Sequence, residues 1–245
     1  MRIAVTGTAG QVVTSLLERG KAAGHEVIAV GRPDLDLADP ASVARVLEAA
    51  KPDVIVSAAA YTAVDKAESE SDLAFAVNGA GAGAVAQTAK KLGVPVIHIS
   101  TDYVFDGMLD RPYVETDPTG PTGVYGASKL AGEQAVLAAH DDSVVLRVAW
   151  VYSPFGGNFV KTMLRLAGDR DEVSVVADQV GNPTSALAIA DSIVQVATNM
   201  VADSSLSLRG IFHMTASGEA SWADFAEGIF AASAARGGPS ASVRL

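Results

Sequence analysis

The sequence predicts an α/β protein built on a doubly wound parallel sheet, with a small additional region toward the C-terminus. Three observations support this fold class. Short apolar runs rich in valine and isoleucine alternate with longer helix-like stretches. The runs are continuously apolar, as expected for parallel strands that helices cover on both faces. A glycine-containing turn separates the first run from the first helix, which is the usual ligand-binding turn of such folds.

The first 150 residues carry the regular part of this pattern. Gly24 closes the first helix, and Asp39 and Pro40 supply the cap and first turn of the second. Strands are expected at residues 2–7, 25–31, 53–59, 94–100 and 143–150. Helices are expected at residues 10–24, 41–51 and 71–93, and around Tyr125. We therefore predict a Rossmann-type dinucleotide-binding domain over residues 1–150.

After Trp150 the alternation loosens. A strand with a loop is expected at residues 172–184 and a strand at 210–216. Helices are expected at residues 158–168, 185–200 and 221–235, the last capped by Ser221. The tail, residues 235–245, is expected to be turn-like and loose. We predict that residues 151–245 form a smaller substrate-binding region, partly interleaved with the first domain, over the carboxyl edge of the sheet.

Composition narrows the class of function. The chain has 245 residues, no cysteine and a net charge of −10 from 18 basic and 28 acidic residues. The absence of cysteine excludes disulfides and thiolate metal sites, and the acidic balance disfavours nucleic acid or an anionic membrane as the main partner. The N-terminus is too short and too glycine-interrupted for a signal peptide, and no run of about eighteen apolar residues predicts a membrane span. A cytoplasmic location is expected.

The segment "AVTGTAGQVV" is the first candidate site. Gly7 allows a tight turn, and Gly10 allows the backbone to approach a pyrophosphate that faces the free N–H groups of the following helix. A plain structural turn is the alternative, but the position after the first strand favours the binding role. Val13 stands where a third glycine normally permits close helix–strand packing, so we expect a slightly more distant helix and a lower cofactor affinity.

The end of the second strand bears on the choice of dinucleotide. NAD-binding chains usually place an Asp or Glu about twenty residues beyond the glycine turn, but here the strand ends in Gly31 and Arg32. Without that carboxylate a 2′-phosphate is not repelled, and Arg32 can pair with it. Asp34 and Asp36 lie nearby, and a solvated surface arginine is an equal alternative. The prediction is NADPH, with NADH as the second choice.

Tyr125 and Lys129 form the second candidate site. They stand at i and i+4 in "VYGASKLAGE", hence on one helix face. A free tyrosine loses its proton at about pH 10, and we expect the Lys129 ammonium to lower that pKa and so help proton exchange with a substrate oxygen. Thr101 ends an apolar strand, where its hydroxyl can hold the same oxygen. Chance produces this spacing in many helices, but its coincidence with the glycine turn and Thr101 favours catalysis.

Six segments together resemble one family. They are "TGTAGQV", "AAAYTAVDKAESE", "STDYVFDG", "YGASKLAGE", "LRVAWVYSPFGGNFVKTML" and "DQVGNPT". These segments are similar to the extended short-chain dehydrogenase/reductases, and most closely to the dTDP-4-dehydrorhamnose reductase family, from residue 1 to about residue 240. The resemblance implies that hydride passes from a nicotinamide to C4 of a dTDP-4-keto-6-deoxy-L-sugar while Tyr125 protonates the oxygen.

The resemblance also assigns roles to residues. It implies that Thr101, Tyr125 and Lys129 are the catalytic set, and that Lys129 also binds the ribose of the cofactor. The residues expected to contact the substrate are Thr101, Asp102, Tyr103 and Trp150. The resemblance implies that Gly10, Gln11 and Val12 contact the pyrophosphate and that Asp36 and Leu37 lie by the adenine. The full set of expected cofactor contacts is Gly7, Gly10, Gln11, Val12, Gly31, Arg32, Asp36, Leu37, Ala60, Tyr61, Thr62, Tyr125 and Lys129.

Three features depart from the family pattern. Val13 replaces the third glycine, Ser57 stands where asparagine is usual, and the chain ends before the segment that commonly completes the substrate region. Some members bind magnesium, but no acidic cluster here matches such a site, so no metal site is predicted and magnesium stays open. The four histidines lack metal-ligand spacing and are interpreted as structural: His25, His98, His140 and His213.

Two other functions stay open. A nucleotide-sugar epimerase or dehydratase of the same superfamily would retain its cofactor and need no added NADPH. The second alternative is a non-catalytic subunit, because proteins similar to this family serve as regulatory subunits of methionine adenosyltransferase. The presence of Thr101, Tyr125 and Lys129 argues against this alternative. Apart from the sugar nucleotide, neither nucleic acid nor a membrane is expected as a partner, and a homodimer is left open.

Overall fold

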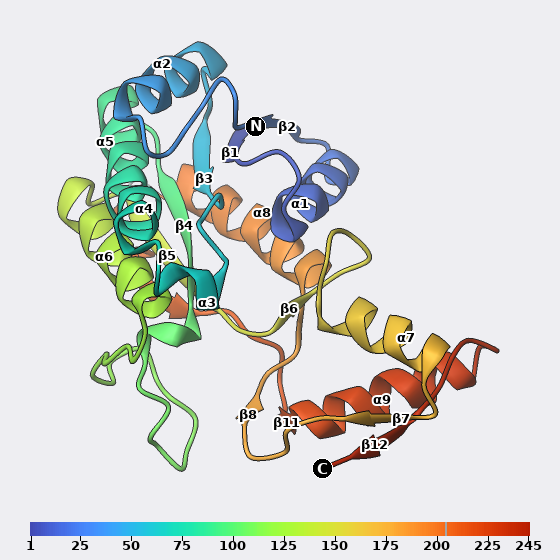
Figure 1. The fold of residues 1–245 in the computed structure, drawn as a ribbon. Coiled ribbons are helices and arrows are strands. Elements are labelled where there is room, and N and C mark those ends of the chain that lie inside the picture. The colour runs from blue at the N-terminus through green and yellow to red at the C-terminus, as the bar shows by residue number, and fades with distance from the viewer. Residues whose placement is uncertain (204) are drawn as a thin grey trace.

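Six parallel strands form the central sheet of the computed structural model, which describes residues 1–203 and 205–245 (Figure 1). The strands lie in the order β10-β5-β4-β3-β1-β2. Their bounds are β1 (Arg2–Thr6), β2 (Glu26–Val30), β3 (Val54–Ser57), β4 (Val96–Thr101), β5 (Ser143–Val148) and β10 (Gly210–His213). Strand β2 lies on one side of β1 and strand β3 on the other, so the direction of winding reverses at β1. This reversal is the topological switch point of a doubly wound sheet. The predicted fold class is confirmed.

Both faces of this sheet are buried. Successive side chains of a strand point to opposite faces. In β1, Ile3 and Val5 enter one core cluster, whereas Ala4 enters the other. Because neither face of the central strands meets solvent, most of their positions carry apolar residues on both faces. This arrangement explains why the apolar runs in the sequence are continuous rather than alternating.

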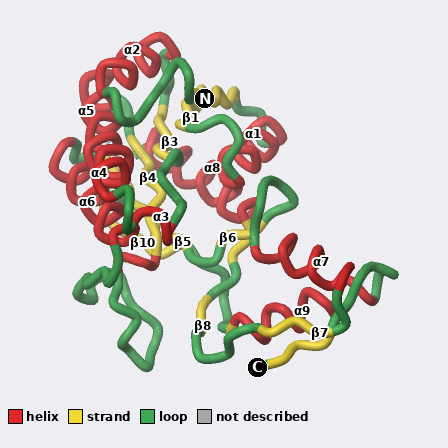
Figure 2. The backbone as a smooth tube through the Cα atoms, in the orientation of Figure 1, coloured by secondary structure: helices red, strands yellow, loops and turns green. Residues whose placement is uncertain are grey.

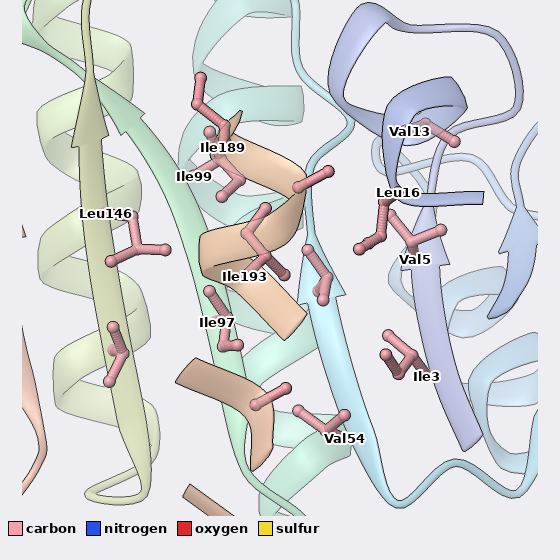
Figure 3. Packing of buried hydrophobic residues seen from close by; sticks show 14 of the residues in the cluster. Ile3, Val5, Val13, Leu16, Val54, Ile97, Ile99, Leu146, Ile189 and Ile193 are labelled. Carbon is pink, nitrogen blue, oxygen red and sulfur yellow. The ribbon is translucent and has the colours of Figure 1, made fainter. Parts of the chain in front are cut away.

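Helices cover the two faces in separate layers. One layer contains α1 (Gln11–Ala22) and α8 (Ala186–Ala202), and the other contains α2 (Pro40–Ala50), α5 (Ala82–Leu92) and α6 (Val124–Ala139). Figure 3 shows Ile189 and Ile193 of α8 packed beside Ile97 and Ile99 of β4. Helix α8 and strand β10 come from the second half of the chain, so the main sheet and its covering layer draw on both halves.

The helix expected over residues 71–93 is one helical stretch with an irregular centre. It consists of α4 (Ser71–Phe75), the π-helical segment η1 (Ala76–Gly81) and α5. A short helix, α3 (Val64–Ala67), precedes it and was not expected. The π turn matters for the site, because it contains Asn78, a buried polar residue that contacts two neighbouring elements.

The C-terminal elements lie apart from the main sheet as a smaller region (Figure 2), and this region has its own hydrophobic core. It contains α7 (Phe159–Asp169), β7 (Glu172–Ser174), α9 (Trp222–Ala234) and β12 (Ser242–Arg244). The prediction of a loose tail over residues 235–245 is wrong here, because β12 pairs in parallel with β7. The physical reason is alternation: Val243 lies opposite Val173 and packs against the regional core, while Ser242 and Arg244 stay exposed.

Four two-residue strands lie along the chain segments that connect this region to the main sheet. Strand β6 (Val151–Tyr152) pairs in parallel with β9 (Thr184–Ser185). Strand β8 (Val180–Gly181) pairs antiparallel with β11 (Ala220–Ser221). None of the helices in the described chain combines the length and apolarity needed to cross a membrane.

Candidate active site

The carboxyl ends of the central strands gather most of the predicted site residues. Gly7 follows β1, Gly31 follows β2, Thr101 ends β4, and Trp150 stands two residues past the end of β5. All these strands run parallel, so their carboxyl ends lie at one edge of the sheet. This edge is where doubly wound folds bind their ligands.

The glycine turn has the form of an anion-binding loop. Gly7 has a φ of 101°, and its N–H donates to the Val30 carbonyl at 2.6 Å. Gly10 is the N-cap of α1 and makes no side-chain cap, whereas Asp39, Asn158 and Ser221 cap α2, α7 and α9. The first-turn N–H groups of α1, including those of Gln11 and Val12, are therefore left for another acceptor. A pyrophosphate fits this requirement.

Gly31 lets the turn lie close to the second strand. A Cβ at Gly31 would stand 3.1 Å from a Thr8 methyl group and 3.3 Å from the Cα of Gly7. A side chain at this position would fill the space next to the glycine turn. Gly31 therefore fits the cofactor role through its small size.

Val13 packs into the main core. It is 2% exposed and lies in the same cluster as Ile3, Val5 and Leu16 (Figure 3). One Val13 methyl group lies 3.2 Å from the point where a Cβ on Gly7 would stand. The valine thus occupies the space beside the glycine turn, and its effect on cofactor affinity stays a prediction.

The Gln11 side chain connects the glycine turn to the smaller region. Its amide nitrogen donates to the Val151 carbonyl at 3.2 Å. Its amide oxygen accepts from the Ser153 hydroxyl at 2.8 Å and from Asn158 Nδ2 at 3.0 Å. We expected only a pyrophosphate contact from Gln11. The polar residues in "VYSPFGGN" were the only signal in the sequence for this second role.

The residues expected near the adenine end of the cofactor differ in environment. Arg32 is exposed and makes no ion pair or hydrogen bond with other residues in the described parts of the chain. The Asp36 carboxylate accepts from the Ala38 N–H at 3.0 Å. The Leu37 side chain is buried in the core, and a Cβ at Gly81 would stand 2.5 Å from its carbonyl oxygen. The Leu37 side chain and carbonyl thus pack against other parts of the chain, and the expected cofactor contact of Leu37 stays a prediction.

The loop with Ala60, Tyr61 and Thr62 is held beside the glycine turn by two polar residues. The Thr6 hydroxyl at the end of β1 accepts from the N–H groups of residues 58 and 59, both at 3.0 Å. Asn78 accepts from the Tyr61 N–H at 2.8 Å and donates to the Tyr61 carbonyl at 3.0 Å. Asn78 also donates to the Ser128 hydroxyl on α6 at 2.9 Å. Asn78 and Ser128 were not predicted as site residues from the sequence. The available signal was a polar residue within a helix made largely of small residues.

Thr101, Asp102, Tyr103 and Tyr125 come together at the end of β4. The Thr101 hydroxyl caps the 3₁₀ turn η2 (Asp102–Val104), accepting from the Tyr103 N–H at 3.2 Å and donating to the Asp102 carboxylate at 3.0 Å. The Tyr103 and Tyr125 rings meet edge to face, with centroids 5.5 Å apart. A Cβ at Gly126 would stand 2.2 Å from the Tyr103 carbonyl, so the glycine lets α6 approach η2.

The expected lowering of the Tyr125 pKa is wrong for this structure. Burial raises the pKa of the Tyr125 phenol to about 12, and a side-chain hydrogen bond with Thr101 offsets only part of the rise. Burial also raises the pKa of the Asp102 carboxyl. The phenolate form of Tyr125 is therefore disfavoured, and the phenol keeps its proton at neutral pH.

The Lys129 ammonium explains why the expected effect on Tyr125 is missing. Lys129 is 3% exposed, and its ammonium donates to the Ile99 carbonyl at 2.7 Å and lies 3.4 Å from His98 Nε2. Burial lowers the Lys129 pKa to about 8, against a smaller opposite effect of Glu133. His98 Nδ1 lies 3.1 Å from the Ser57 hydroxyl, and burial, then Lys129, holds the His98 pKa well below its usual value. Ser57 is thus the partner of a neutral His98.

A buried ion pair fixes α6 to the sheet. Glu133 accepts from two Arg147 nitrogens on β5, at 2.7 and 2.9 Å, and both side chains are almost fully buried. The Ser100 hydroxyl of β4 donates to the same carboxylate at 2.5 Å. The pair thus ties the helix that carries Tyr125 to β5, and the Ser100 hydrogen bond ties the same helix to β4, the strand that carries Thr101. We did not predict it, although an acid and a base inside apolar runs were the signal.

Trp150 lies at the same edge of the sheet and stacks on Trp222, the first residue of α9. The ring centroids are 3.5 Å apart and the planes differ by 8°. Trp222 was not among the predicted site residues. Within residues 1–203 and 205–245, no cluster of three or more histidines or carboxylates has the geometry of a metal site.

Comparison with known proteins covers almost the whole chain. A family model described as the RmlD substrate binding domain matches residues 1–244. A relative from Sinorhizobium fredii named dTDP-4-dehydrorhamnose reductase is 55% identical over 230 residues, which make up 94% of this chain and 77% of the relative.

Solved structures agree with this match. The crystal structure of a dTDP-4-dehydrorhamnose reductase from Clostridium acetobutylicum has a TM-score of 0.91 at 38% identity, over 100% of this chain and 83% of that one. The structure of a reductase of the same name from Bacillus anthracis, in complex with NADP, has a TM-score of 0.91 at 36% identity, over 99% and 82%. The similarity includes the glycine turn, the helix of Tyr125 and the smaller region.

Proposed function

Because the chain belongs to the RmlD substrate binding domain family, with relatives named dTDP-4-dehydrorhamnose reductase, we propose that it reduces dTDP-4-dehydro-L-rhamnose to dTDP-L-rhamnose with NADPH. The observation that carries this proposal is the position of the Tyr125 side chain, whose ring packs on Tyr103 just past Thr101, at the ligand-binding edge of the sheet. A reductase needs a proton donor at this place, because hydride transfer to a ketone leaves a negative oxygen.

Different residues of the chain have different roles in the proposed reaction. Bound NADPH supplies the hydride for C4 of the sugar. The uncapped first turn of α1, from Gly10 to Val12, holds the pyrophosphate through its N–H groups. Tyr125 gives its phenolic proton to the C4 oxygen, and the new O–H bond completes the alcohol. Thr101 has one hydroxyl proton, which it can donate to Asp102 or to the phenol, so it steadies the oxygen that loses its proton.

Lys129 is proposed to influence Tyr125 through the charge of its buried ammonium group. Its ammonium is buried between β4 and α6, in a layer of low polarity where charges are weakly screened. In the present arrangement, with the ammonium on the Ile99 carbonyl, this charge does not lower the Tyr125 pKa; we propose that it favours the phenolate left by proton transfer only after the side chain turns toward Tyr125. We also propose ribose binding by Lys129, substrate contacts from Asp102, Tyr103 and Trp150, and a preference for NADPH that depends on Arg32.

The test is the oxidation of NADPH by purified protein with freshly made dTDP-4-keto-6-deoxy-L-sugar. We expect one NADPH consumed for each sugar reduced, and loss of this activity in Tyr125→Phe. Conversion of the sugar without NADPH consumption would instead indicate an epimerase. No turnover, together with recovery of a larger enzyme in a pull-down, would indicate a regulatory subunit. Repeating the assay with a chelator measures any need for magnesium, and light scattering measures whether the protein forms a homodimer, which the sequence leaves open.

A further inference from the structure

Both tryptophans of the chain lie in one stacked pair. The composition includes two tryptophans, and the Trp150 and Trp222 rings stack with centroids 3.5 Å apart. Trp150 follows β5 of the main sheet, whereas Trp222 begins α9 of the smaller region. The pair is therefore a direct contact between the two parts of the molecule.

Trp150 has an uncommon backbone conformation next to the proposed catalytic group. Its φ is 45°, in the left-handed region that a bulky side chain seldom adopts. Val148, two residues earlier, lies opposite Thr101 in the sheet register. A strained residue at the edge of a site persists only where its surroundings hold it.

The segment "DQVGNPT", residues 178–184, holds the two indoles together. The Thr184 N–H donates to the Trp150 carbonyl at 3.1 Å. In the β8–β11 pair, Gly181 lies opposite Ala220 and Val180 opposite Ser221, the residue before Trp222. One short segment therefore fixes the backbone at Trp150 and the backbone next to Trp222.

Gly181 also makes room for Trp150. A Cβ at this position would stand 2.5 Å from the Cε2 atom and 2.7 Å from the Nε1 atom of the indole. Any other side chain would have to push the indole away. The indole of Trp150 is thus confined by Gly181 and by the Trp222 ring.

Trp222 itself is held rigidly. Ser221 and Asp224 form a capping box, in which the Asp224 N–H donates to the Ser221 hydroxyl at 3.0 Å and the Ser221 N–H donates to the Asp224 carboxylate at 2.9 Å. The Phe159 ring lies 4.5 Å from the Trp222 ring. The helix start and this contact fix the plane against which Trp150 stacks.

We propose that Trp222 is a positioning residue for the sugar nucleotide, because it holds the Trp150 indole in place at the edge of the sheet where Thr101 ends β4. This inference rests on the proposed function and extends it to a residue outside the reacting groups. Loss of the stack frees Trp150, so the sugar nucleotide binds more weakly, whereas the glycine turn and the cofactor are unaffected.

The experiment compares Trp222→Ala and Trp222→Phe with the parent protein. We expect Trp222→Ala to raise the KM for the sugar nucleotide roughly three- to tenfold, the range of an aromatic stacking contact, with the KM for NADPH unchanged. Trp222→Phe, which keeps an aromatic ring, should restore most of the affinity. Near-ultraviolet circular dichroism reports the stack directly, because no other tryptophan is present.

Two further variants separate positioning from general destabilisation. Gly181→Ala displaces Trp150 while Trp222 stays intact, and it should raise the same KM even if Trp222→Ala does not fold. Phe225→Leu removes an aromatic ring from the same regional core, 6.5 Å from Trp222, and should leave the KM unchanged. An unchanged sugar-nucleotide KM in both Trp222→Ala and Gly181→Ala would overturn the inference.

Failure of the proposed function gives a different result. If the parent protein does not consume NADPH, titration calorimetry with dTDP-L-rhamnose replaces the kinetic assay. Weaker binding by Trp222→Ala and Gly181→Ala than by Phe225→Leu would still support the positioning role. Equal binding by all of these variants and the parent would reject it.

Discussion

The Lys129 ammonium lies 2.7 Å from the carbonyl oxygen of Ile99, two residues before Thr101 on the same strand. The lysine therefore places its charge against the sheet, in the layer behind Tyr125. Burial moves the two pKa values apart, raising that of the phenol to about 12 and lowering that of the ammonium to about 8, because it disfavours the charged form of each group. The tyrosine keeps the proton that it is proposed to donate.

Replacement of Tyr125 by phenylalanine should remove the proton and keep the ring. We expect turnover to fall by roughly 10²–10⁴ with little change in the melting temperature. Tyr103→Phe is the matched control, since its ring packs on Tyr125 but its phenol is half exposed, and it should affect KM more than turnover. Near-normal turnover in Tyr125→Phe would remove the residue from the role of proton donor.

The buried Lys129 should give folding stability a distinct pH dependence. Its pKa is about 8 in the folded chain against a reference value of 10.5, so between these values the unfolded chain binds more protons. Stability contributed by this group therefore rises with pH across that window and is flat below it.

Lys129→Met removes this titration. We expect the melting temperature of the parent minus that of the variant to increase between about pH 8 and pH 10, measured in matched buffers. The upper limit stays below the range in which Tyr125 titrates in the folded state. A difference that is constant or decreases over this range would mean that folding does not lower the pKa of Lys129.

Arg32 should decide the preference between cofactors. Because it is exposed and unpaired in the described chain, its guanidinium is available for a 2′-phosphate. We expect NADPH to bind more tightly than NADH, and Arg32→Ala to narrow the gap by about 1.5 kcal/mol, roughly tenfold in affinity. Arg19→Ala is the control, since Arg19 is paired with Asp191 at 2.6 Å. Equal parent affinities for the two cofactors would leave Arg32 as a surface charge.

Val13 offers a test of helix placement. Val13→Gly should lower the melting temperature, because it removes a buried side chain and adds a glycine to the helix, which costs about 0.5–1 kcal/mol by itself. Val13→Ala isolates the packing loss from the glycine effect. If the valine holds α1 away from the sheet, Val13→Gly should bind cofactor more tightly, and added cofactor should partly restore stability. Weaker binding would show that the helix is already well placed.

Much of the fold could be predicted because local patterns express it. The continuous apolar runs predict strands that are buried on both faces of the sheet, and the glycine turn predicts the position of the switch point. The structure has both features. The tail was mistaken for a loop because its strand is three residues long and gains stability only from a partner, β7, that is remote in sequence. Short-range patterns carry no information about such pairing.

The candidate site could be predicted in part for the same reason. Spacing placed Tyr125 and Lys129 on one helix face, but it could not tell that burial would dominate the tyrosine pKa or that the ammonium would turn toward Ile99. Asn78 and Trp222 contact the site through tertiary packing alone. A sequence shows residue types, whereas these contacts depend on which elements become neighbours.

The Glu133–Arg147 pair limits how this protein can change over time. Losing either partner alone leaves a buried charge uncompensated, which costs about 3–5 kcal/mol, whereas exchanging both for apolar residues of similar size is often close to neutral. The two positions are therefore epistatic. Replacing both residues one at a time passes through a single mutant that is strongly destabilised and that selection mostly removes. We expect the pair to be inherited as one unit, although fourteen positions separate its members along the chain.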